Sequence, residues 1–419
     1  MPDRYIADLH VHSRYSRATS RDCDLGGLHH WAQRKGVAVV GTGDFTHPAW
    51  FKELSSNLEP AEPGLYRLRR KVAAAADRGV PAACRADVRF LLSGEISSIY
   101  RRDGRVRRVH SLVLAPDLET VAKFNTRLAR LGNIASDGRP ILKLDPRDLL
   151  DLLLEAHPAC ALIPAHIWTP WFAMLGSMSG FDSLEACFGD RARQVFAVET
   201  GLSSDPPMNW RVSGLDAVAL VSNSDLHSPS ALGRDANVFF GRPDYFRMLD
   251  GLRRRDPAVC GGTIDLFPEE GKYTLDGHRA CGFSCAPAET RRLGGRCPRC
   301  GKPLTIGVLS RVEALAGRPA GFRPPGALPH AYIIPLPELL GEVLGVGPAA
   351  KKVRAACDAL LAACGPELAI LRDVPPDALD AHGPPRLSEA VRRLRAGQVV
   401  RRGGYDGVYG TVRALPESE

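Results

Sequence analysis

Short apolar runs rich in Val, Ile and Leu recur through the first half of the chain, and nearly all carry a histidine or carboxylate towards the C-terminal edge. Amphipathic stretches such as LGGLHHWAQRKG (25–36) and LETVAKFNTRLARLG (118–132) lie between them. Repeated strand-then-helix units predict an α/β fold with a parallel sheet, closed as a barrel or left open. Active sites of α/β folds form at that edge, so we expect the functional site there. The runs are VAVVGTGD (37–44), VRFLLSGEIS (88–97), RRVHSLVLA (107–115), CALIPAH (160–166), VFAVETG (195–201) and AVALVSNSD (217–225).

Two histidines follow the apolar segment RYIADL near the N-terminus. On a strand, alternation puts the imidazoles of His10 and His12 on one face, with Val11 opposite. Converging carboxylates repel one another unless cations neutralise them. The pattern therefore favours a polynuclear metal centre over a coincidental set of polar strand ends. The later runs supply Asp44, Glu95, His110, His166, Glu199, Asp225 and His227 at the same edge.

Ligands of these types suit zinc or manganese, and magnesium is a third candidate although it prefers an all-oxygen shell. Two or three ions ~3.5–4 Å apart suit phosphate-ester hydrolysis, because one activates water while another neutralises charge on the phosphate oxygens. The sequence carries neither a nucleophile elbow nor a dinucleotide-binding glycine loop. It predicts a metal-dependent phosphoesterase, with Glu95, Asp225 and His227 acting in catalysis.

Four of the eleven cysteines lie between residues 281 and 300, and the others are scattered. Cys297-Pro-Arg-Cys300 followed by Gly301 has the form of a zinc-knuckle turn. Cys281 supplies a third ligand, and either His278 or Cys285 completes a tetrahedral site. We expect one structural zinc rather than a redox pair, because the motif lacks a thioredoxin-like setting of strand and helix.

The pattern of the chain changes near residue 256 and again in the linker-like stretch 317–330. These changes predict a metal-dependent phosphoesterase domain over 1–250, a zinc-binding module over 256–316 and a helical, basic region over 330–419. The chain has no signal-peptide pattern and no apolar stretch of ~20 residues. We therefore expect no membrane contact and a cytoplasmic, nucleoid-associated location.

The C-terminal half carries features typical of DNA binding. The whole chain has a formal net charge of +8 and a pI near 9.0, which favour a polyanionic partner. Gly345 and Gly347 separate two apolar helical segments, and Lys351 and Lys352 follow. This spacing fits a helix-hairpin-helix element that binds a DNA phosphate, and equally an ordinary helix connection.

The motifs DLHVHSRYS, GTGDF, GEIS, the histidine of RRVHSLVL, IPAH and SNSDLH resemble those of the PHP (polymerase and histidinol phosphatase) superfamily, whose fold is a distorted (β/α) barrel. The resemblance implies one ion held by His10, His12, Glu95 and Asp225. It implies a second ion that shares Glu95 and is held by His110 and His166, and a third position completed by Asp44 and His227. Phe45 stands where many relatives carry a histidine, so His47 is either a substitute ligand or an exposed turn residue.

Over the whole chain, the motifs GTGDFTHP, ETGLSSDPPMNWR, SNSDLHSP, GKYTLDGHRACG, CPRCGKPLTIGVLSRVEALAGRP, LGVGPAAKKV and GYDGVYG are similar to the endonuclease Q family. The resemblance implies a DNA repair endonuclease that cuts on the 5′ side of uracil, hypoxanthine, xanthine or an abasic site. Damaged DNA is then the partner, and a replication sliding clamp is a further candidate.

The alternative is a small-molecule phosphatase of the histidinol-phosphatase type, which needs neither the zinc module nor the basic region. A flipped lesion would require a pocket with stacking side chains. Each aromatic candidate could instead pack beneath the loops. These candidates are Trp168, Trp171, Phe172 and Trp210.

Overall fold

The predicted strands and helices of the first half form close to the expected residues. The structure is a computed structural model that describes residues 4–416. The strands are β1 (Arg4–Asp8), β2 (Val39–Gly41), β3 (Leu58–Pro60), β4 (Tyr66–Leu68), β5 (Arg89–Arg102), β6 (Arg105–Ala115), β7 (Ile141–Leu142), β8 (Ala161–Pro164), β9 (Ala197–Glu199), β10 (Ala219–Val221), β11 (Ala236–Phe240), β12 (Cys260–Leu266), β13 (Asp276–His278), β14 (Phe283–Cys285), β15 (His330–Ile333), β16 (Val400–Arg402) and β17 (Thr411–Arg413).

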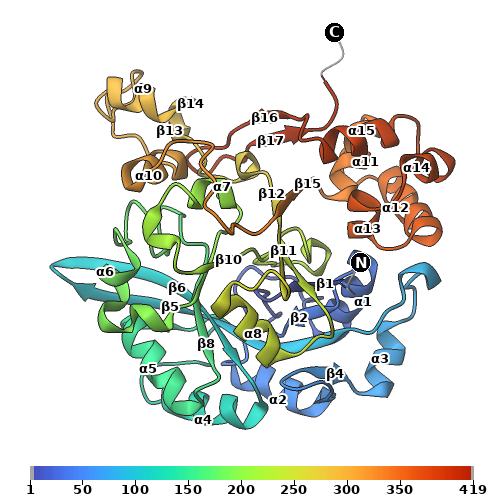
Figure 1. Ribbon diagram of the computed structural model, residues 1–419, viewed down its shortest axis with the longest axis horizontal. Coiled ribbons are helices and arrows are strands. Elements are labelled where there is room, and N and C mark those ends of the chain that lie inside the picture. Colours follow the sequence, from blue (N-terminus) through green and yellow to red (C-terminus); the bar gives the residue numbers. More distant parts are fainter. Residues whose placement is uncertain (1–3, 417–419) are drawn as a thin grey trace.

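The helices alternate with strands in the first half and dominate the C-terminal region (Figure 1). They are α1 (Leu25–Lys35), α2 (Pro48–Asn57), α3 (Arg70–Ala76), α4 (Leu118–Leu128), α5 (Pro146–Ala156), α6 (Leu184–Phe188), α7 (Pro206–Asn209), α8 (Tyr245–Arg254), α9 (Pro287–Arg292), α10 (Val308–Leu315), α11 (Leu336–Leu344), α12 (Lys351–Cys364), α13 (Glu367–Arg372), α14 (Pro376–His382) and α15 (Leu387–Arg395). Within residues 4–416, none of these helices is both long and apolar enough to cross a membrane.

The predicted α/β class is confirmed, but the expectation of a parallel sheet throughout is wrong. β1, β2 and β5 run parallel, whereas β6 is antiparallel to β5 and β8, and β11 is antiparallel to β1. β9 and β10 form a separate parallel pair. Backbone hydrogen bonds link this pair to its neighbours, from Ile167 N to Glu199 O (3.0 Å) and from His12 N to Leu226 O (3.1 Å). The strands thus surround a common centre as a distorted ring.

The long β5–β6 hairpin is the main departure from strand-helix alternation. Its turn consists of Asp103 and Gly104, both with positive φ (52° and 71°). Asp-Gly is a preferred pair for a two-residue hairpin turn that needs two left-handed residues. The pair is visible in the sequence, so the antiparallel order was open to prediction there.

The sheet continues past residue 256 into the C-terminal half. β12 pairs with β11, and β15 pairs with β12. The segment between β12 and β15 contains β13, β14, α9 and α10, which lie at the upper left of Figure 1. Helices α11 to α15 lie at the upper right, and the β16–β17 hairpin runs between the two groups. The chain from β13 onwards therefore lies mostly along the upper side of the molecule in this view.

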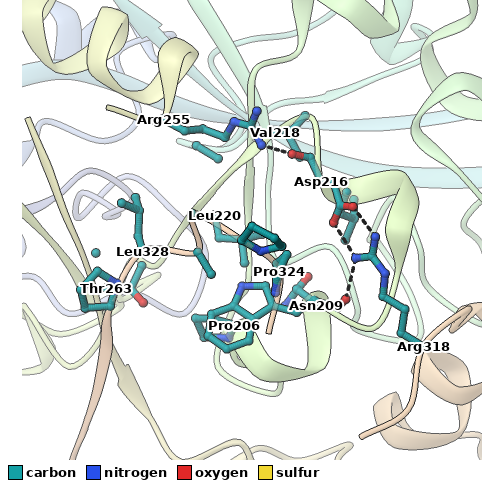
Figure 2. A pocket seen from close by; sticks show the side chains of 18 residues that line it. Pro206, Asn209, Asp216, Val218, Leu220, Arg255, Thr263, Arg318, Pro324 and Leu328 are labelled. Carbon is teal, nitrogen blue, oxygen red and sulfur yellow. Dashed lines mark hydrogen bonds and ion pairs between the residues drawn. The ribbon is translucent and has the colours of Figure 1, made fainter. Parts of the chain in front are cut away.

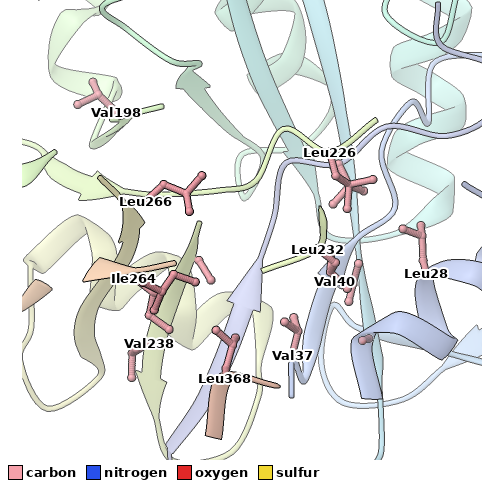
Figure 3. Close-up of a cluster of buried hydrophobic side chains, with 14 of the residues drawn as sticks. Leu28, Val37, Val40, Val198, Leu226, Leu232, Val238, Ile264, Leu266 and Leu368 are labelled. Carbon is pink, nitrogen blue, oxygen red and sulfur yellow. The ribbon is translucent and has the colours of Figure 1, made fainter. Parts of the chain in front are cut away.

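A buried ion pair fastens the C-terminal helices to the first half of the chain. Lys35 Nζ on α1 lies 2.7 Å from Glu367 Oε2 on α13, and their side chains are 5% and 7% exposed. Glu367 Oε1 also accepts the N–H of Leu336 at 3.1 Å. Leu368 lies near Val37 in the apolar cluster of Figure 3. The two halves therefore share one hydrophobic core.

Replacing Glu367 by glutamine should lower the free energy of unfolding by about 3 kcal/mol, because Lys35 would be left charged and unpaired inside the protein. Asp358→Asn is the matched control. Asp358 pairs with Arg34 of the same helix α1 but is 62% exposed, so its loss should lower that free energy by less than about 1 kcal/mol. Urea unfolding of both variants measures the difference, and equal effects would contradict the assignment.

Candidate metal centre

The candidate ligands meet where the strands of the ring end. His10 and His12 follow β1, His166 follows β8 and Asp225 follows β10, while Glu95 and His110 lie within β5 and β6. His166 and Asp225 adopt positive φ (31° and 46°). Such backbone is uncommon for residues other than glycine and is concentrated at functional sites.

Glu95, His10, His12 and Asp225 form the first cluster, with one ligand atom from each residue lying within 4.8 Å of all the others. His12 Nε2 lies 3.0 Å from Asp225 Oδ1 and 3.2 Å from Glu95 Oε2. His10 Nε2 lies 3.5 Å from Glu95 Oε2. Two imidazole nitrogens and two carboxylates thus face one small volume.

Glu95 also belongs to a second cluster, with His110 and His166. Its Oε1 lies 2.7 Å from His110 Nδ1 and 3.2 Å from His166 Nε2. The two oxygens of Glu95 therefore face different clusters. This is the arrangement expected of a carboxylate that bridges two ions.

The donor atoms fit divalent cations. His10 is fully buried, and its Nε2 has no hydrogen-bond partner among the described residues. An unpartnered buried nitrogen is unfavourable unless another group takes its lone pair. His10 Nδ1 lies 3.0 Å from Glu199 Oε1. This contact leaves the lone pair of Nε2 available to a cation in the cluster.

Two buried carboxylates orient the first two histidines. Glu199 contacts His10 Nδ1, and Asp44 Oδ1 lies 3.0 Å from His12 Nδ1. Asp44 Oδ2 accepts hydrogen bonds from the N–H and hydroxyl of Ser13 and from the hydroxyl of Ser16. Asp44 thus lies behind His12, on the side of the ring opposite to the first cluster. Carboxylates placed this way fix the ring orientation and raise the basicity of ligating histidines.

Of the other two residues considered for a third position, His227 lies beside the first cluster, with its ring 4.6 Å from that of His12, and His47 contacts neither cluster. His227 is one-third exposed and its Nδ1 contacts the backbone oxygen of Asp225 at 3.0 Å. His47 stacks on Tyr15 and its Nε2 contacts Ala135 O at 3.1 Å. In the part of the chain that is described, neither joins a group of metal-ligating atoms. His47 is buried, so the alternative of an exposed turn residue is wrong.

Opposite charges dominate the electrostatics of the centre. Burial favours neutral Glu95, but the neighbouring His110, Arg139 and His10 outweigh it and hold the pKa of Glu95 well below its usual value. Burial disfavours protonation of His10, yet the charges of Glu199, Glu95 and Asp225 raise its pKa well above the usual value. Burial lowers the pKa of His110 to about 4. The centre therefore holds ionised carboxylates that attract cations.

A cleft of about 1450 Å³ opens above the clusters. Its floor includes His110, His166 and Asp225, and its opposite wall comes from α11 and the β16–β17 hairpin. Trp171 and Phe172 line this cleft. Trp168 does not, because it is buried beneath the loops, where its Nε1 donates to Asn209 Oδ1 (2.8 Å).

Trp210 lies in a different and smaller cavity of about 190 Å³. That cavity is formed by α7, β10, β12 and the proline-rich stretch 324–329, and Figure 2 shows the Asp216–Arg318 ion pair at its side. Trp210 packs edge-on against His330 there. Trp210 therefore lies outside the cleft above the clusters.

The cysteine cluster includes His278 and leaves Cys285 outside. One ligand atom each from His278, Cys281, Cys297 and Cys300 lies within 4.8 Å of the others. Cys285 pairs with Asp276 at the opposite end of the β13–β14 hairpin, and its Sγ contacts Thr290 Oγ1 at 3.2 Å. Burial raises the pKa of the Cys297 thiol, but backbone N–H groups of the knuckle outweigh it and lower that pKa, which favours the thiolate.

His278→Ala should remove one zinc per chain and lower the thermal stability, because a structural zinc contributes directly to folding. Cys285→Ala is the matched control and should keep the zinc. Elemental analysis of both purified variants makes the comparison. Loss of zinc from the cysteine variant alone would instead place Cys285 in the site.

Two helices, α11 and α12, flank the glycines of the C-terminal region as the sequence predicts. Gly345 has φ 66° and ends α11, and α12 begins at Lys351. Gly347, Lys351 and Lys352 are exposed. No side chain caps the N-terminus of α12. Backbone N–H groups and two lysines thus face solvent together, which suits a phosphate.

A family model described as the MJ0043 C-terminal domain matches residues 335–398. YqxK of Bacillus subtilis is 29% identical over 423 residues, covering 98% of this chain and 99% of that protein. MJ0043 of Methanocaldococcus jannaschii is 29% identical over 260 residues, covering 60% of this chain and 32% of that protein.

Two solved structures resemble the whole chain. The lesion-specific endonuclease PfuEndoQ from Pyrococcus furiosus has a TM-score of 0.84 and 28% identity, covering 99% of this chain and 96% of the other. A complex of Endonuclease Q with a 27-mer duplex substrate, which has an abasic lesion at the active site, also has a TM-score of 0.84 and 28% identity. It covers 99% of this chain and 97% of that one.

Proposed function

This chain belongs to the endonuclease Q family, and we propose that it is a metal-dependent DNA repair endonuclease. It hydrolyses the phosphodiester on the 5′ side of uracil, hypoxanthine, xanthine or an abasic site. The observation that carries the proposal is the pair of metal-ligand clusters sharing Glu95 at the floor of a cleft whose opposite wall is the C-terminal region.

The cleft favours a polymer over a small phosphate monoester. Pockets for small ligands are typically about 300–1,000 Å³, and this cleft is larger at about 1450 Å³. Its far wall includes Arg402, Tyr409 and Arg413, which a histidinol-phosphatase-like enzyme would not need. The lysines after Gly347 and the zinc module add DNA-backbone contacts beyond the cleft in this proposal.

We assign one divalent cation to His10, His12, Glu95 and Asp225, and a second to Glu95, His110 and His166, with zinc, manganese and magnesium as the candidates. Such ions supply Lewis acidity at the phosphate and lower the pKa of water, which is the chemistry that phosphodiester hydrolysis requires. The chain itself holds the ligands in position through Glu199 and Asp44.

The damaged nucleotide enters the cleft extruded from the duplex. Extrusion costs a few kcal/mol and less for a mispaired or missing base, which gives selectivity for deaminated and abasic sites. Trp171 and Phe172 line the cleft beside His110 and His166. Their rings supply surfaces on which an extruded base can stack.

The test uses end-labelled duplexes with one uracil, hypoxanthine, abasic or undamaged site, each incubated with the full chain and Mn²⁺, Mg²⁺ or Zn²⁺. We expect a single nick on the 5′ side of the lesion and an intact undamaged duplex. A chelator should abolish nicking. Hydrolysis of small phosphate monoesters with no nicking of any lesion duplex would instead support the phosphatase alternative.

A further inference from the structure

Arg139 brings a positive side chain into the metal centre, although it belongs to a loop between α4 and β7. The loop is held on both sides of the arginine. Gly138 N donates to Tyr15 O (2.9 Å), and Pro140 O accepts from Ser97 N (3.0 Å). A Cβ on Gly138 would lie 2.4 Å from Asp44 Oδ2, so the close approach of this loop requires glycine.

The guanidinium contacts the shared carboxylate. Arg139 Nη1 lies 3.0 Å from Glu95 Oε2, the oxygen that also faces His12 Nε2 at 3.2 Å. The charge of Glu95 raises the pKa of Arg139. The side chain is 27% exposed and lines the cleft. Arg139 therefore stands between the first cluster and the space that a substrate would enter.

A cation at the first cluster would compete with Arg139 for the same oxygen of Glu95. A unit charge repels a divalent ion about 4 Å away strongly in a partly buried site. The planar guanidinium can instead pair with two oxygens of a phosphate, which is the geometry that arginine favours. Arg139 already lines the cleft, so this exchange requires rotation of the side chain and no movement of the loop.

We propose that Arg139 is the phosphate-binding cation of this active site. In the metal-free centre it neutralises Glu95. In the metal-loaded centre its guanidinium turns into the cleft and binds the non-bridging oxygens of the scissile phosphodiester, whose negative charge grows as water attacks. The proposal rests on the proposed function, because it takes a phosphodiester as the substrate.

Metal affinity gives the first test and needs no DNA. The metal-free protein is titrated with Mn²⁺, and Arg139→Met should bind the ion about tenfold more tightly because the competing charge is gone. Arg413→Met is the matched control. Arg413 lines the same cleft but lies 3.5 Å from Glu342 instead of Glu95, so its removal should leave the affinity unchanged. Weaker binding to Arg139→Met would mean that the arginine only orients Glu95, and would overturn the proposal.

Turnover gives the second test, on a lesion duplex at saturating Mn²⁺. Arg139→Met should lower kcat by about 10²–10³-fold, as removal of a preorganised donor to a developing anion does. Added guanidinium ions should restore part of the lost activity. Arg139→Lys should retain part of the wild-type kcat. If Arg139 had a purely structural role, neither the rescue by guanidinium nor the tighter metal binding would be expected.

The two proposals fail in different ways. A wild-type protein that cuts no lesion duplex overturns the proposed function. Unchanged kcat in Arg139→Met, measured on both the lesion duplex and the small phosphodiester bis(p-nitrophenyl) phosphate, overturns the role of Arg139 and leaves the endonuclease assignment intact.

Discussion

Replacing Glu95 by alanine should reduce cleavage of a lesion duplex by at least a thousandfold. Glu95 contributes one oxygen to each metal cluster, so its loss weakens both sites at once. Metal ions contribute several kcal/mol of transition-state stabilisation, and ~1.4 kcal/mol corresponds to a factor of ten in rate. Among the described residues, Glu95 is the one that belongs to both clusters of the metal centre.

Binding and catalysis should separate in this variant. Affinity for DNA comes largely from phosphate contacts, so Glu95→Ala should bind the lesion duplex nearly as well as the wild type. Glu95→Gln keeps the volume of the buried side chain and guards against misfolding. Glu155→Ala removes an exposed carboxylate and should behave as the wild type. More than a few per cent of activity in both Glu95 variants would refute the metal assignment.

Glu199 and Asp44, the carboxylates that orient His10 and His12, should affect metal affinity nearly as strongly as the ligands do. Glu199→Gln and Asp44→Asn should each weaken metal binding by about 10–100-fold, which is the usual effect of removing such a partner of a ligating histidine. The buried hydrogen bonds to His10 and His12 set which ring nitrogen faces the cluster. The measurement is titration of the metal-free variants with Mn²⁺ or Zn²⁺.

Excess metal separates this orienting role from direct ligation. Activity of Glu199→Gln should recover towards the wild-type value at high metal concentration, whereas that of Asp225→Ala, a variant that lacks a ligand, should not. Unchanged metal affinity in Glu199→Gln and Asp44→Asn would show that ring orientation is fixed by packing alone. Far-ultraviolet circular dichroism establishes that each variant is folded.

The sequence predicts part of the gathering of ligands, because several ligands follow strands that end at one edge. Glu95 and His110 instead lie inside the antiparallel strands β5 and β6. His10, His12, Glu95, His110, His166 and Asp225 all follow or lie on strands of the ring, and the structure brings their side chains together. Asp44 obeys the same rule, yet it lies one layer deeper, behind His12. Position at a strand end does not distinguish a ligand from the carboxylate that orients a ligand.

Other parts of the site depend on distant pairings that a linear pattern does not encode. Arg139 reaches Glu95 from a loop whose place is set by contacts with residues 15 and 97. Residue type alone does not separate Trp210 from Trp171. Trp210 follows α7 and lies against the proline-rich stretch before β15. His278 joins the cysteine cluster and Cys285 does not, because the register of the β13–β14 hairpin places them at opposite ends of its three-residue strands.

The Lys35–Glu367 pair makes the folding of the first half of the chain depend on a residue that is synthesised much later. The partners are 332 residues apart, so at about 5–20 residues per second the lysine waits roughly 20–70 s for its carboxylate. Until then α1 cannot bury its charge, and the edge of β12 has no β15 to cover it. The first half should therefore complete its fold only after α13 and β15 have been made, and fragments that stop before β15 should depend on chaperones or be degraded.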